Sequence, residues 1–587
     1  MHSMTNPFAL HQIKSPLLKA LIRALSKIDV LEKWYDDWLQ KNDGKHGDGD
    51  EFVADALDNL LNAKAEVVHE HILGDIPPQG AFIVVANHPL GGLDGLLLTQ
   101  LLRTIRPDLK VLTNKLLSTI PEFKDIFIGV DVLNAGSERH NMHAMRTVSR
   151  HLGEGGAVLI FPAGTVSRIH LPSFAIYDAP WNVMVSKLAS KYNSPVMPIF
   201  VEGRNKLSFY LAGFIHKRLR TLLLPRAMLS KKGETIVLHL GAPIPASDLN
   251  RLSDDAIAMH YIRLCCKVLS CSKEKRGTAP QHLQNIKEDV ETTKVAAHIN
   301  TLSDCLLYEQ NEFKLYCAPY ARLGPVMEQL SIERERTFRH VDEGTGYELD
   351  SDRFDPHYMH LLLWDVQKQK IAGGYRLGKT DEIIQSIGLD GLYSHSLFDY
   401  NAQFLTDMGK TIEVGRSFIA KDYQKNPAAL DVLWKGIGRF VVSNPQYHTL
   451  FGCVSISRQY SDLVSAMLTE TFLSHYGVTD SVMRNVKARS PVKAIEKPWT
   501  PEQIASLSAI PIVNKLVGRI DAGKSIPVLI RHYLALNGRF ISFTINHGFG
   551  QALEGLIMVD LRISQDKHLK RYMGQDGLRA FKSYHTK

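Results

Sequence analysis

A histidine and a carboxylate stand close together in the segment 87–95, which reads NHPLGGLDG. The segment follows the apolar run Ala81–Ala86 and precedes the helix-like run Leu96–Leu102. A strand that delivers a histidine into a turn, with an aspartate at the start of the next helix, can supply a general base and a carboxylate that orients it. We therefore interpret His88 and Asp94 as catalytic residues of an active site.

The elements that must position these residues alternate between strand-like and helix-like runs. Strand-like runs lie at Phe82–Ala86, Lys110–Leu112, Ala157–Phe161, Val196–Val201 and Thr235–Leu240. The segments between them are long enough for helices, and Asp254–Leu269 has a helical pattern. This alternation predicts an α/β domain with a mixed or parallel sheet and helices on its faces.

A polar segment with a Gly and Pro break, Ser272–Thr293, is the clearest boundary in the chain. We therefore predict a first domain over residues 1–271, a linker over 272–296 and a second domain over 297–587. The length of 587 residues agrees with more than one hydrophobic core.

Beyond the linker, a helical run at Ala297–Leu307 precedes a second set of strands. These strands are predicted at His360–Val366, Ile371–Leu377, Thr411–Ile419, Leu450–Ile456, Phe540–Ile545 and Leu556–Leu561. Only Gln367–Lys370 separates the first two, which is the length of a hairpin connection. The second domain is therefore expected to be α+β with a largely antiparallel sheet.

Composition narrows the class of protein without selecting a partner. The chain is 44% hydrophobic and 22% charged, which is typical of a folded globular protein. Its net charge of +8 is spread along the sequence; it suits an anionic membrane surface or an acidic carrier protein and falls short of a nucleic-acid-binding pattern. Six cysteines without Cys-x-x-Cys spacing, and an N-terminus without a signal peptide, indicate a reducing cytoplasm.

Two stretches are candidates for contact with a membrane, although no apolar run reaches the roughly 20 residues that span a bilayer. Pro16–Leu39 alternates apolar and charged residues, and Leu207–Leu229 interleaves apolar residues with basic ones. Each pattern fits a basic amphipathic helix on anionic lipid, and it equally fits a surface helix that packs on its own domain.

Four blocks of the first half resemble those of the glycerolipid acyltransferase superfamily, which esterifies lysolipids. They are NHPLGGLDG at 87–95, FIGVDVLN at 127–134, FPAGTVSR at 161–168 and SPVMPIFVEGRN at 194–205. The resemblance covers about Leu73–Ile244 and implies transfer of an acyl group from a thioester to a hydroxyl. A neutral imidazole, with a pKa of about 6.5, suits His88 as the base, and Asp94 would hold its tautomer.

The resemblance also implies that the FPAGT block faces the head group of the acceptor. Gly164 and Thr165 lie where backbone N–H groups could meet an anion, and Arg168 is the nearby cation. Ala163 replaces the usual glutamate of this block, and five residues rather than four separate the histidine from the aspartate. We infer an acceptor that is not a simple phosphate monoester.

Three motifs of the second half resemble those of ornithine N-acyltransferases and acyl-homoserine-lactone synthases, which have the acetyltransferase-like (GNAT) fold. They are GTGYELDSDRFD at 344–355, GGYRL at 373–377 and IEVGRSF at 412–418. An α-amine is protonated at neutral pH, so N-acylation needs a proton acceptor, and Glu413 is the carboxylate expected to serve.

The other charged residues of these motifs are candidate ligands of the amino acid. Asp350, Asp352 and Asp355 would attract a cationic amino acid such as ornithine, while Arg376 and Arg416 could hold its carboxylate. Alternatives are a cation loop, a solvated acidic loop, or a structural ion pair between Glu413 and Arg416. No metal is required.

The donor is expected to be an acyl carrier protein, with acyl-CoA as the alternative. GNAT folds usually bind the pyrophosphate of CoA on a glycine-rich loop, whereas the matching stretch here, 424–429, reads QKNPAA. Its proline has no N–H to meet an anion. No cofactor beyond the acyl donor is implied.

Together the two halves resemble bifunctional ornithine-lipid synthases. The resemblance implies N-acylation of ornithine, glycine or another small amino acid, followed by O-acylation of the lyso-lipid, by a peripheral protein on the inner face of the cytoplasmic membrane. A single-function lysophospholipid O-acyltransferase with a docking module and a non-enzymatic membrane-surface protein are the alternatives.

Overall fold

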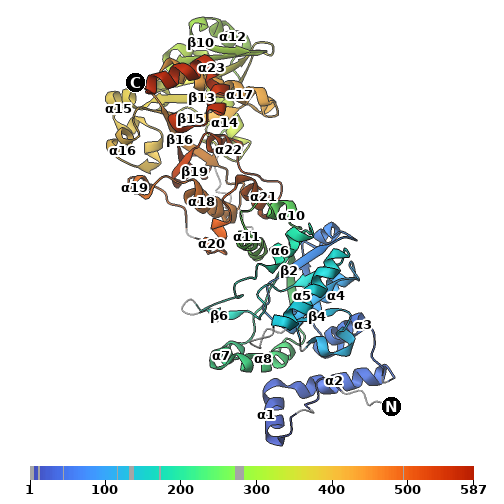
Figure 1. The fold of residues 1–587 in the computed structure, drawn as a ribbon. Coiled ribbons are helices and arrows are strands. Elements are labelled where there is room, and N and C mark those ends of the chain that lie inside the picture. The colour runs from blue at the N-terminus through green and yellow to red at the C-terminus, as the bar shows by residue number, and fades with distance from the viewer. Residues whose placement is uncertain are drawn as a thin grey trace. The chain divides into compact units, whose positions relative to one another are not determined.

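The computed structural model describes residues 6–10, 13–43, 45–115, 117–130, 138–170, 174–271, 283–493 and 495–586, and it leaves the side chains of 138–140, 217 and 218 undescribed. Much of the expected linker and the end of the block 127–134 lie outside these residues. The chain forms two compact units (Figure 1). Unit 1 comprises Met1–Ser272 and Pro498–Ile512, and unit 2 comprises Lys273–Lys497 and Val513–Lys587.

Unit 1 contains a seven-stranded sheet in the order β1-β9-β8-β2-β5-β3-β4. Its strands are β1 (Lys64–Val68), β2 (Phe82–Ala86), β3 (Lys110–Asn114), β4 (Phe127–Val130), β5 (Ala157–Ile160), β8 (Val196–Val201) and β9 (Thr235–Leu240). Neighbouring strands are parallel except β8 and β9, which are antiparallel. The predicted mixed α/β sheet is therefore confirmed, and β1 and β4 are additional edge strands.

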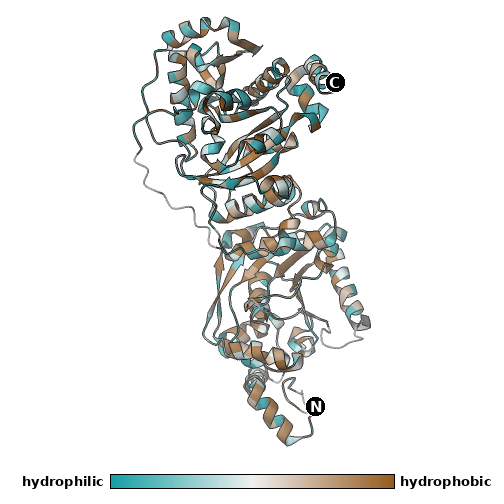
Figure 2. Ribbon diagram, turned by 90° about the vertical axis from the view of Figure 1, so that its left-hand side faces the viewer, coloured by the Kyte–Doolittle hydropathy of each residue, from teal (hydrophilic) through white to brown (hydrophobic). Residues whose placement is uncertain are grey.

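The centre of this sheet is buried on both faces. Every residue of β2 is buried; Phe82, Val84 and Ala86 share a core with leucines of α4 (Gly92–Arg103), and the alternate residues point to the other face. On this unit α11 (Asp255–Lys267) packs against β8 and against α6 (Met184–Lys191). A strand that is apolar on both sides requires helices on both faces, and Figure 2 colours these strands largely as hydrophobic.

Several helices of unit 1 leave apolar side chains in solvent. The helix expected over Pro16–Leu39 is two helices, α1 (Pro16–Ser26) and α2 (Ile28–Lys41), because Lys27 adopts a left-handed conformation with φ 56°. The stretch Leu207–Leu229 forms α7 (Leu207–Ile215), α8 (Lys217–Leu222) and α9 (Leu224–Leu229). Exposed residues of α1 and α7 include Leu17, Leu21, Leu211, Phe214 and Ile215.

Unit 2 contains an eight-stranded sheet in the order β10-β11-β12-β13-β15-β16-β19-β18. Its strands are β10 (Leu306–Gln310), β11 (Phe313–Pro319), β12 (Met359–Asp365), β13 (Lys370–Lys379), β15 (Thr411–Ile419), β16 (Thr449–Ile456), β18 (Arg539–Asn546) and β19 (Ala552–Asp560). All neighbours are antiparallel except β15 and β16, which confirms the predicted α+β class.

The parallel pair is short. Thr411–Glu413 of β15 pair with Thr449–Phe451 of β16, and the two strands part beyond these residues. A bulge lies in the part of β15 that no longer pairs with β16, because Arg376 of β13 opposes Gly415 while Gly374 opposes Phe418. Arg416 carries this bulge in a left-handed conformation, φ 48°. A bulge turns the side chain away from its regular alternation, so Arg416 points toward the space beside the parted strands.

Helices cover the sheet of unit 2. α14 (Pro325–Arg339) packs against β13 and β15, and α17 (Pro427–Ser443) packs against β10 to β13 and against α23 (Asp566–His585). The helix predicted at Ala297–Leu307 is wrong in its second part: α12 spans Thr292–Asn300, and β10 then begins at Leu306. β10 is an edge strand of only partly buried and exposed residues, so it lacks the clear apolar alternation of a core strand.

Residues 498–512, in the C-terminal half of the sequence, belong to unit 1, where α20 (Pro501–Ala505) packs against α11.

Within the described ranges, no helix combines the length and the apolar character needed to cross a bilayer. All six cysteines are free thiols, and Cys265 and Cys266 are buried.

Candidate active sites

The NHP turn of unit 1 is fixed to the neighbouring strand by amide side chains. Nδ2 of Asn87 donates to the carbonyl of Val201 at 2.9 Å, and the N–H of Val201 donates back to Oδ1 at 2.7 Å. Nδ2 of Asn205 donates to the carbonyl of Pro89 at 2.9 Å. Hydrogen bonds therefore fix the backbone on both sides of His88, just beyond the end of β2.

His88 and Asp94 are in contact. Nδ1 of His88 lies 3.1 Å from Oδ2 of Asp94, which also accepts the N–H groups of Leu90 at 2.9 Å and Gly91 at 3.1 Å. Gly91, with φ 82°, forms the turn that lets a carboxylate six positions along the chain face the ring. Because Nδ1 faces the carboxylate, Nε2 is the nitrogen left for a substrate.

The carboxylate of Asp94 is fully buried, and its side chain has no exposed surface. Burial raises the pKa of Asp94, and the hydrogen bonding and charge of His88 oppose that rise. The His88 side chain is 18% exposed, so its ring can be reached from outside. A buried acceptor behind a reachable imidazole is the arrangement that stabilises an imidazolium during proton transfer.

The FPAGT block packs against the histidine. The ring of Phe161 lies 4.2 Å from that of His88, and the N–H of Ser167 donates to the carbonyl of His88 at 2.9 Å. Oδ1 of Asp178 accepts the N–H of His88 at 3.3 Å and the hydroxyl of Ser167 at 2.5 Å. The structure thus brings the first and third blocks together, with Asp178 as a link that no motif indicated.

Gly164, Thr165 and Arg168 occupy the turn and the strand after this block. Gly164 has φ 64°, and its N–H donates to the carbonyl of Phe161 at 2.9 Å. That N–H is therefore hydrogen-bonded within the turn, which differs from its expected role as a donor to an anion. Thr165 is partly exposed. Arg168 is the first residue of β6 (Arg168–His170) and is exposed. The pKa of Arg220 is lowered by its own burial and by the positive charge of Arg168.

A cavity of about 420 Å³ adjoins the NHP turn. Its wall includes Asn87, Pro89 and Ser167, the aromatic residues Phe174, Tyr177, Trp181 and Phe200, and the cations Arg204, Arg263 and Lys267. The wall of this cavity therefore combines aromatic and basic side chains with one acidic residue, Asp178.

The cations of the cavity are only partly compensated. Nη2 of Arg263 donates to the backbone carbonyl of Asp178 at 2.8 Å. Lys267 forms no ion pair or side-chain hydrogen bond within the described part of the chain. Burial, and then the charge of Arg263, lowers the pKa of Lys267. Arg204, Arg263 and Lys267 outnumber the acidic Asp178 in the wall of the cavity, which favours an anionic ligand.

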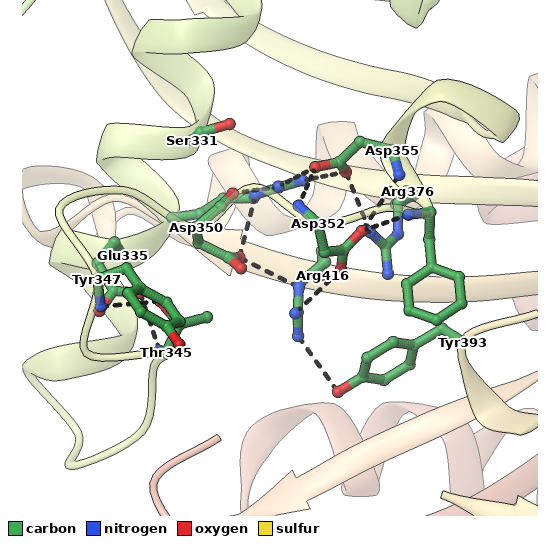
Figure 3. A network of polar contacts seen from close by, with 12 residues as sticks. Ser331, Glu335, Thr345, Tyr347, Asp350, Asp352, Asp355, Arg376, Tyr393 and Arg416 are labelled. Atoms are coloured by element: carbon green, nitrogen blue, oxygen red, sulfur yellow. Dashed lines mark hydrogen bonds and ion pairs between the residues drawn. The ribbon is translucent and has the colours of Figure 1, made fainter. Parts of the chain in front are cut away.

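In unit 2, three arginines and three aspartates form a closed ring of alternating charge (Figure 3). In order around the ring they are Arg334, Asp355, Arg376, Asp352, Arg416 and Asp350. The six closest approaches are 2.9, 3.0, 2.6, 3.2, 3.1 and 3.2 Å in that order. The side chains are between 0% and 18% exposed, so we call this set the charged ring.

The charged ring balances its own charges. Burial alone would raise the pKa of Asp352 and Asp355, but the arginines beside them hold both pKa values below their usual range. Burial raises the pKa of Asp350 despite Arg416 and Arg334. The neighbouring aspartates raise the pKa of Arg376 and Arg416 against the effect of burial. Three positive and three negative groups leave no net charge.

This pairing differs from the expected ligand roles. Asp350, Asp352 and Asp355 face arginines of the protein, so they are not free to attract a cationic amino acid. Arg376 and Arg416 are likewise engaged, and Arg416 pairs with Asp350 and Asp352 rather than with Glu413. The ring is better described as a scaffold that fixes α14, β13 and β15 to the 350–355 loop.

Glu413 is 2% exposed and has a full set of donors. Oε1 accepts the N–H of Ser394 at 2.6 Å, and Oε2 accepts the N–H of Tyr393 at 3.1 Å and the hydroxyl of Tyr358. A carboxylate so occupied anchors the loop of residues 393 and 394, which differs from the expected role as proton acceptor.

Tyr393 joins that loop to the charged ring. Its hydroxyl accepts from Nη1 of Arg416 at 3.3 Å and from Nδ2 of Asn546 at 2.9 Å. Its ring lies 4.8 Å from the guanidinium of Arg416 and 5.4 Å from that of Arg376. No motif indicated Tyr393, Asn546 or Arg334; the only signal for Arg334 is a charged run, ERER, on an otherwise buried helix.

Two family profiles match the chain. Residues 65–274 match the family described as "Acyltransferase", and residues 334–435 match the family described as "Acetyltransferase (GNAT) domain". The chain therefore contains an acyltransferase domain and a GNAT-type domain and is an enzyme that transfers acyl groups. This combination fits the architecture of a bifunctional ornithine-lipid synthase.

Three characterised proteins are similar to parts of the chain. The glycine N(alpha)-acyltransferase of Phocaeicola vulgatus is 28% identical over 278 residues, which are 44% of this chain and 83% of that protein. The lyso-glycine lipid O-acyltransferase of the same organism is 28% identical over 228 residues, 38% of this chain and 78% of that protein. The L-ornithine N(alpha)-acyltransferase of Rhodobacter capsulatus is 23% identical over 235 residues, 38% of this chain and 79% of that protein.

Proposed function

We propose that this acyltransferase makes a diacylated amino-acid lipid in two steps. The GNAT-type half first N-acylates an amino acid with a 3-hydroxyacyl chain from acyl carrier protein, and the N-terminal half then O-acylates the hydroxyl of that lyso-lipid. One observation carries the proposal: a single chain holds a His88–Asp94 pair at a strand end and, separately, parted strands beside a charged ring. Two separate proteins of Phocaeicola vulgatus, named for the two steps, support it.

In the second step, Nε2 of His88 takes the proton of the hydroxyl as its oxygen attacks the thioester carbonyl. The C–S bond then breaks, and the imidazolium returns the proton to the leaving sulfur. Asp94, 3.1 Å from Nδ1, keeps the ring in the required tautomer and stabilises the imidazolium. General-base assistance of this kind contributes about 10²- to 10⁴-fold.

The acceptor of the second step would carry a free carboxylate, because N-acylation leaves that group of the amino acid unchanged. The cations Arg263 and Lys267, which line the cavity beside the NHP turn, offer it a complementary charge. The aromatic residues Trp181 and Phe200 offer an apolar surface to the acyl chain.

For the first step we propose glycine as the leading acceptor and ornithine as the second candidate. The acidic residues that suggested ornithine are paired within the charged ring, which removes the reason to expect a second cation on the amino acid. The chain is similar to both a glycine and an ornithine N-acyltransferase, so both amino acids are candidate acceptors.

An acyl carrier protein remains the proposed donor, with acyl-CoA as the alternative. The first turn of α17 has few free N–H groups for a pyrophosphate. Pro427 has no N–H, and the side chain of Asn426 accepts the N–H of Ala428 at 3.0 Å. The N–H of Ala429 donates to the carbonyl of Asn426 at 3.3 Å. Helix N-termini bind phosphates through free N–H groups, and these are occupied or missing.

We further propose that unit 1 rests on the inner face of the cytoplasmic membrane. Leu17 is 84% exposed on α1 and Ile215 is 76% exposed on α7, with Arg23 and Arg226 on neighbouring surface. α1 contacts α8 and α9, which follow α7 in the chain. Exposed aliphatic side chains with arginines on the neighbouring surface suit anionic lipid and a lyso-lipid that stays in the bilayer.

The test is lipid analysis by mass spectrometry after expression in a bacterium that has 3-hydroxyacyl carrier protein and makes no amino-acid lipid. The intact chain is expected to produce the mono- and diacylated amino-acid lipids, with the amino acid identified from the fragment masses. His88→Ala should accumulate the mono-acylated amide. An unchanged lipid profile with the intact, folded chain would contradict the proposal.

A further inference from the structure

Two more carboxylates of unit 2 lie outside the charged ring, on segments that pack together. Glu554 lies on β19, and the strand register places it opposite Ser455 of β16, beyond the point where β16 leaves β15. Glu343 lies in the turn after α14. That turn packs on the loop before β19, since a methyl group on Gly550 would be 2.9 Å from the Cα of Glu343. Residues far apart in sequence therefore meet beside the parted strands.

Glu554 uses one of its oxygens. Oε1 accepts the hydroxyl of Ser455 at 3.1 Å and Nδ2 of Asn546 at 3.3 Å. The same amide donates to the hydroxyl of Tyr393 at 2.9 Å, which also accepts from Arg416. Glu554 is thereby held in place through Tyr393 and the charged ring, while its Oε2 has no protein donor among the residues that the structure describes.

Glu343 has no hydrogen-bond partner for its carboxylate within the described ranges, and part of its surface is accessible. Burial of the carboxylate, together with the charge of Glu554, raises its pKa to about 8, and Arg416 opposes that rise. Burial also raises the pKa of Glu554. Tyr460 also interacts with Glu343: burial, Asp521 and Glu343 together raise the pKa of Tyr460 to about 12.

Neither carboxylate forms an ion pair with a protein cation among the described residues, so the pair can accept a cationic group from outside. Arg416, whose charge lowers the pKa of both carboxylates, already pairs with Asp350 and Asp352. A metal ion would need further ligands, and the described residues hold no group of three or more His, Cys, Asp or Glu side chains suited to one. An ammonium group needs only hydrogen-bond acceptors, and it is the group that N-acylation consumes.

We infer that Glu343 and Glu554 form the amine site of the N-acylation, in which Glu554 holds the α-ammonium of the amino acid and Glu343 takes its proton. The inference rests on the proposed function of this half. It replaces Glu413, whose oxygens are occupied, as the proton acceptor.

Glu343 removes one proton from the ammonium, and the free amine attacks the thioester carbonyl to form the C–N bond. The C–S bond breaks, the second proton of nitrogen passes to the leaving sulfur, and the products are the amide and the thiol. Glu343 then releases its proton to water. A base with a pKa near the working pH does this most effectively.

The experiment compares purified full-length chains with 3-hydroxyacyl carrier protein and either glycine or ornithine, with the amide measured by mass spectrometry from pH 6 to pH 10. The variants are Glu343→Gln and Glu554→Gln, and Glu348→Gln is the matched control, because Glu348 is an exposed glutamate in the same segment. The control should retain the activity of the intact chain.

Glu343→Gln should lower kcat/KM for the amino acid by about 10²- to 10⁴-fold at neutral pH. The intact chain should gain activity through pH 8, as Glu343 loses its proton, and the variant should lose that step of the profile. Glu554→Gln should raise KM for the amine more than it lowers kcat.

Thermal unfolding separates this loss from misfolding. The folded-state pKa of Glu343, about 8, exceeds the unfolded value of about 4.3, so the folded state binds more protons and ionisation costs stability as pH rises through that range. Glu343→Gln should therefore unfold at a higher temperature than the intact chain at pH 9, while being less active.

The outcomes distinguish the two claims. If the intact chain acylates no amino acid, the proposed function fails and the inference falls with it. If the intact chain is active and Glu343→Gln retains both its rate and its pH profile, the inference alone is overturned. A folded Glu343→Gln chain that loses the rate and the step at pH 8 supports both.

Discussion

The His88–Asp94 pair and the charged ring are both polar and largely enclosed, yet they leave different groups free. In unit 1, one oxygen of Asp94 meets two N–H groups and the imidazole, and the other nitrogen of His88 has no partner among the described residues. In unit 2, each charge of the ring meets two of opposite sign. A group that the protein has already paired positions its neighbours, whereas a group left unpaired can do chemistry.

The largest effect should come from the unpaired imidazole. His88→Ala removes the general base, so we expect O-acylation of the lyso-lipid to fall by about 10³-fold, with N-acylation unchanged. His143→Ala, an exposed histidine on α5 (Glu138–Gly153), is the control and should change neither rate. Separate assays of the two steps make the measurement, and loss of both rates in His88→Ala would contradict the division of labour.

Breaking the charged ring should act first on stability. Arg334→Met leaves Asp350 and Asp355 with one guanidinium fewer in a buried site, which should cost about 3–5 kcal/mol of unfolding free energy. Hydrogen exchange should detect the loss in unit 2 and leave unit 1 unchanged.

Arg336→Met is the matched control for that change, because Arg336 lies on the same helix with its side chain 39% exposed in surface ion pairs. Such pairs contribute about 0–1 kcal/mol. Equal destabilisation by the two substitutions would show that the ring is not a scaffold.

How far apart the members of each site lie in the sequence determined whether the site could be predicted. His88 and Asp94 lie in one turn, and the strands Phe82–Ala86 and Val196–Val201 around them have the predicted bounds because their apolar runs end sharply. Pattern and spacing sufficed for local geometry of this kind.

The charged ring could not be predicted in the same way, because its members meet only in the folded unit. The motifs identified its three aspartates and two of its arginines, but not that they face one another. Arg334 lies within ERER on α14, and charges normally mark the exposed face of a helix. Glu343 and Glu554 are 211 positions apart in sequence, and the packing of the turn after α14 on the loop before β19 brings them near each other.

A substitution of Glu413 tests whether a carboxylate with both oxygens hydrogen-bonded supports catalysis by holding its neighbours in place. Glu413→Gln replaces an acceptor with an NH₂ group that faces backbone N–H donors, so the loop of Tyr393 and Ser394 should shift. We expect N-acylation to fall by about 10²-fold, through both kcat and KM. Glu382→Gln, an exposed glutamate of the same unit, should have no effect. A shift of the pH profile instead of a uniform loss would restore Glu413 as the base.

The smallest effect is expected in the cavity beside the NHP turn. Lys267→Met removes a cation that has no partner in the described structure, and it should raise KM for the lyso-lipid about tenfold while leaving kcat unchanged. Lys187→Met, an exposed lysine on α6, is the control. An unchanged KM would place the carboxylate of the acceptor elsewhere.

The central claim, two sites that work in series through a released lyso-lipid, is tested most directly by mixing two defective chains. His88→Ala makes the lyso-lipid and cannot use it, and Glu413→Gln retains the second site and lacks an efficient first one. With amino acid and acyl donor supplied, we expect the mixture to form the diacylated lipid at a rate far above that of either chain alone. If the mixture forms no more than the two chains do separately, the account of two independent sites is contradicted.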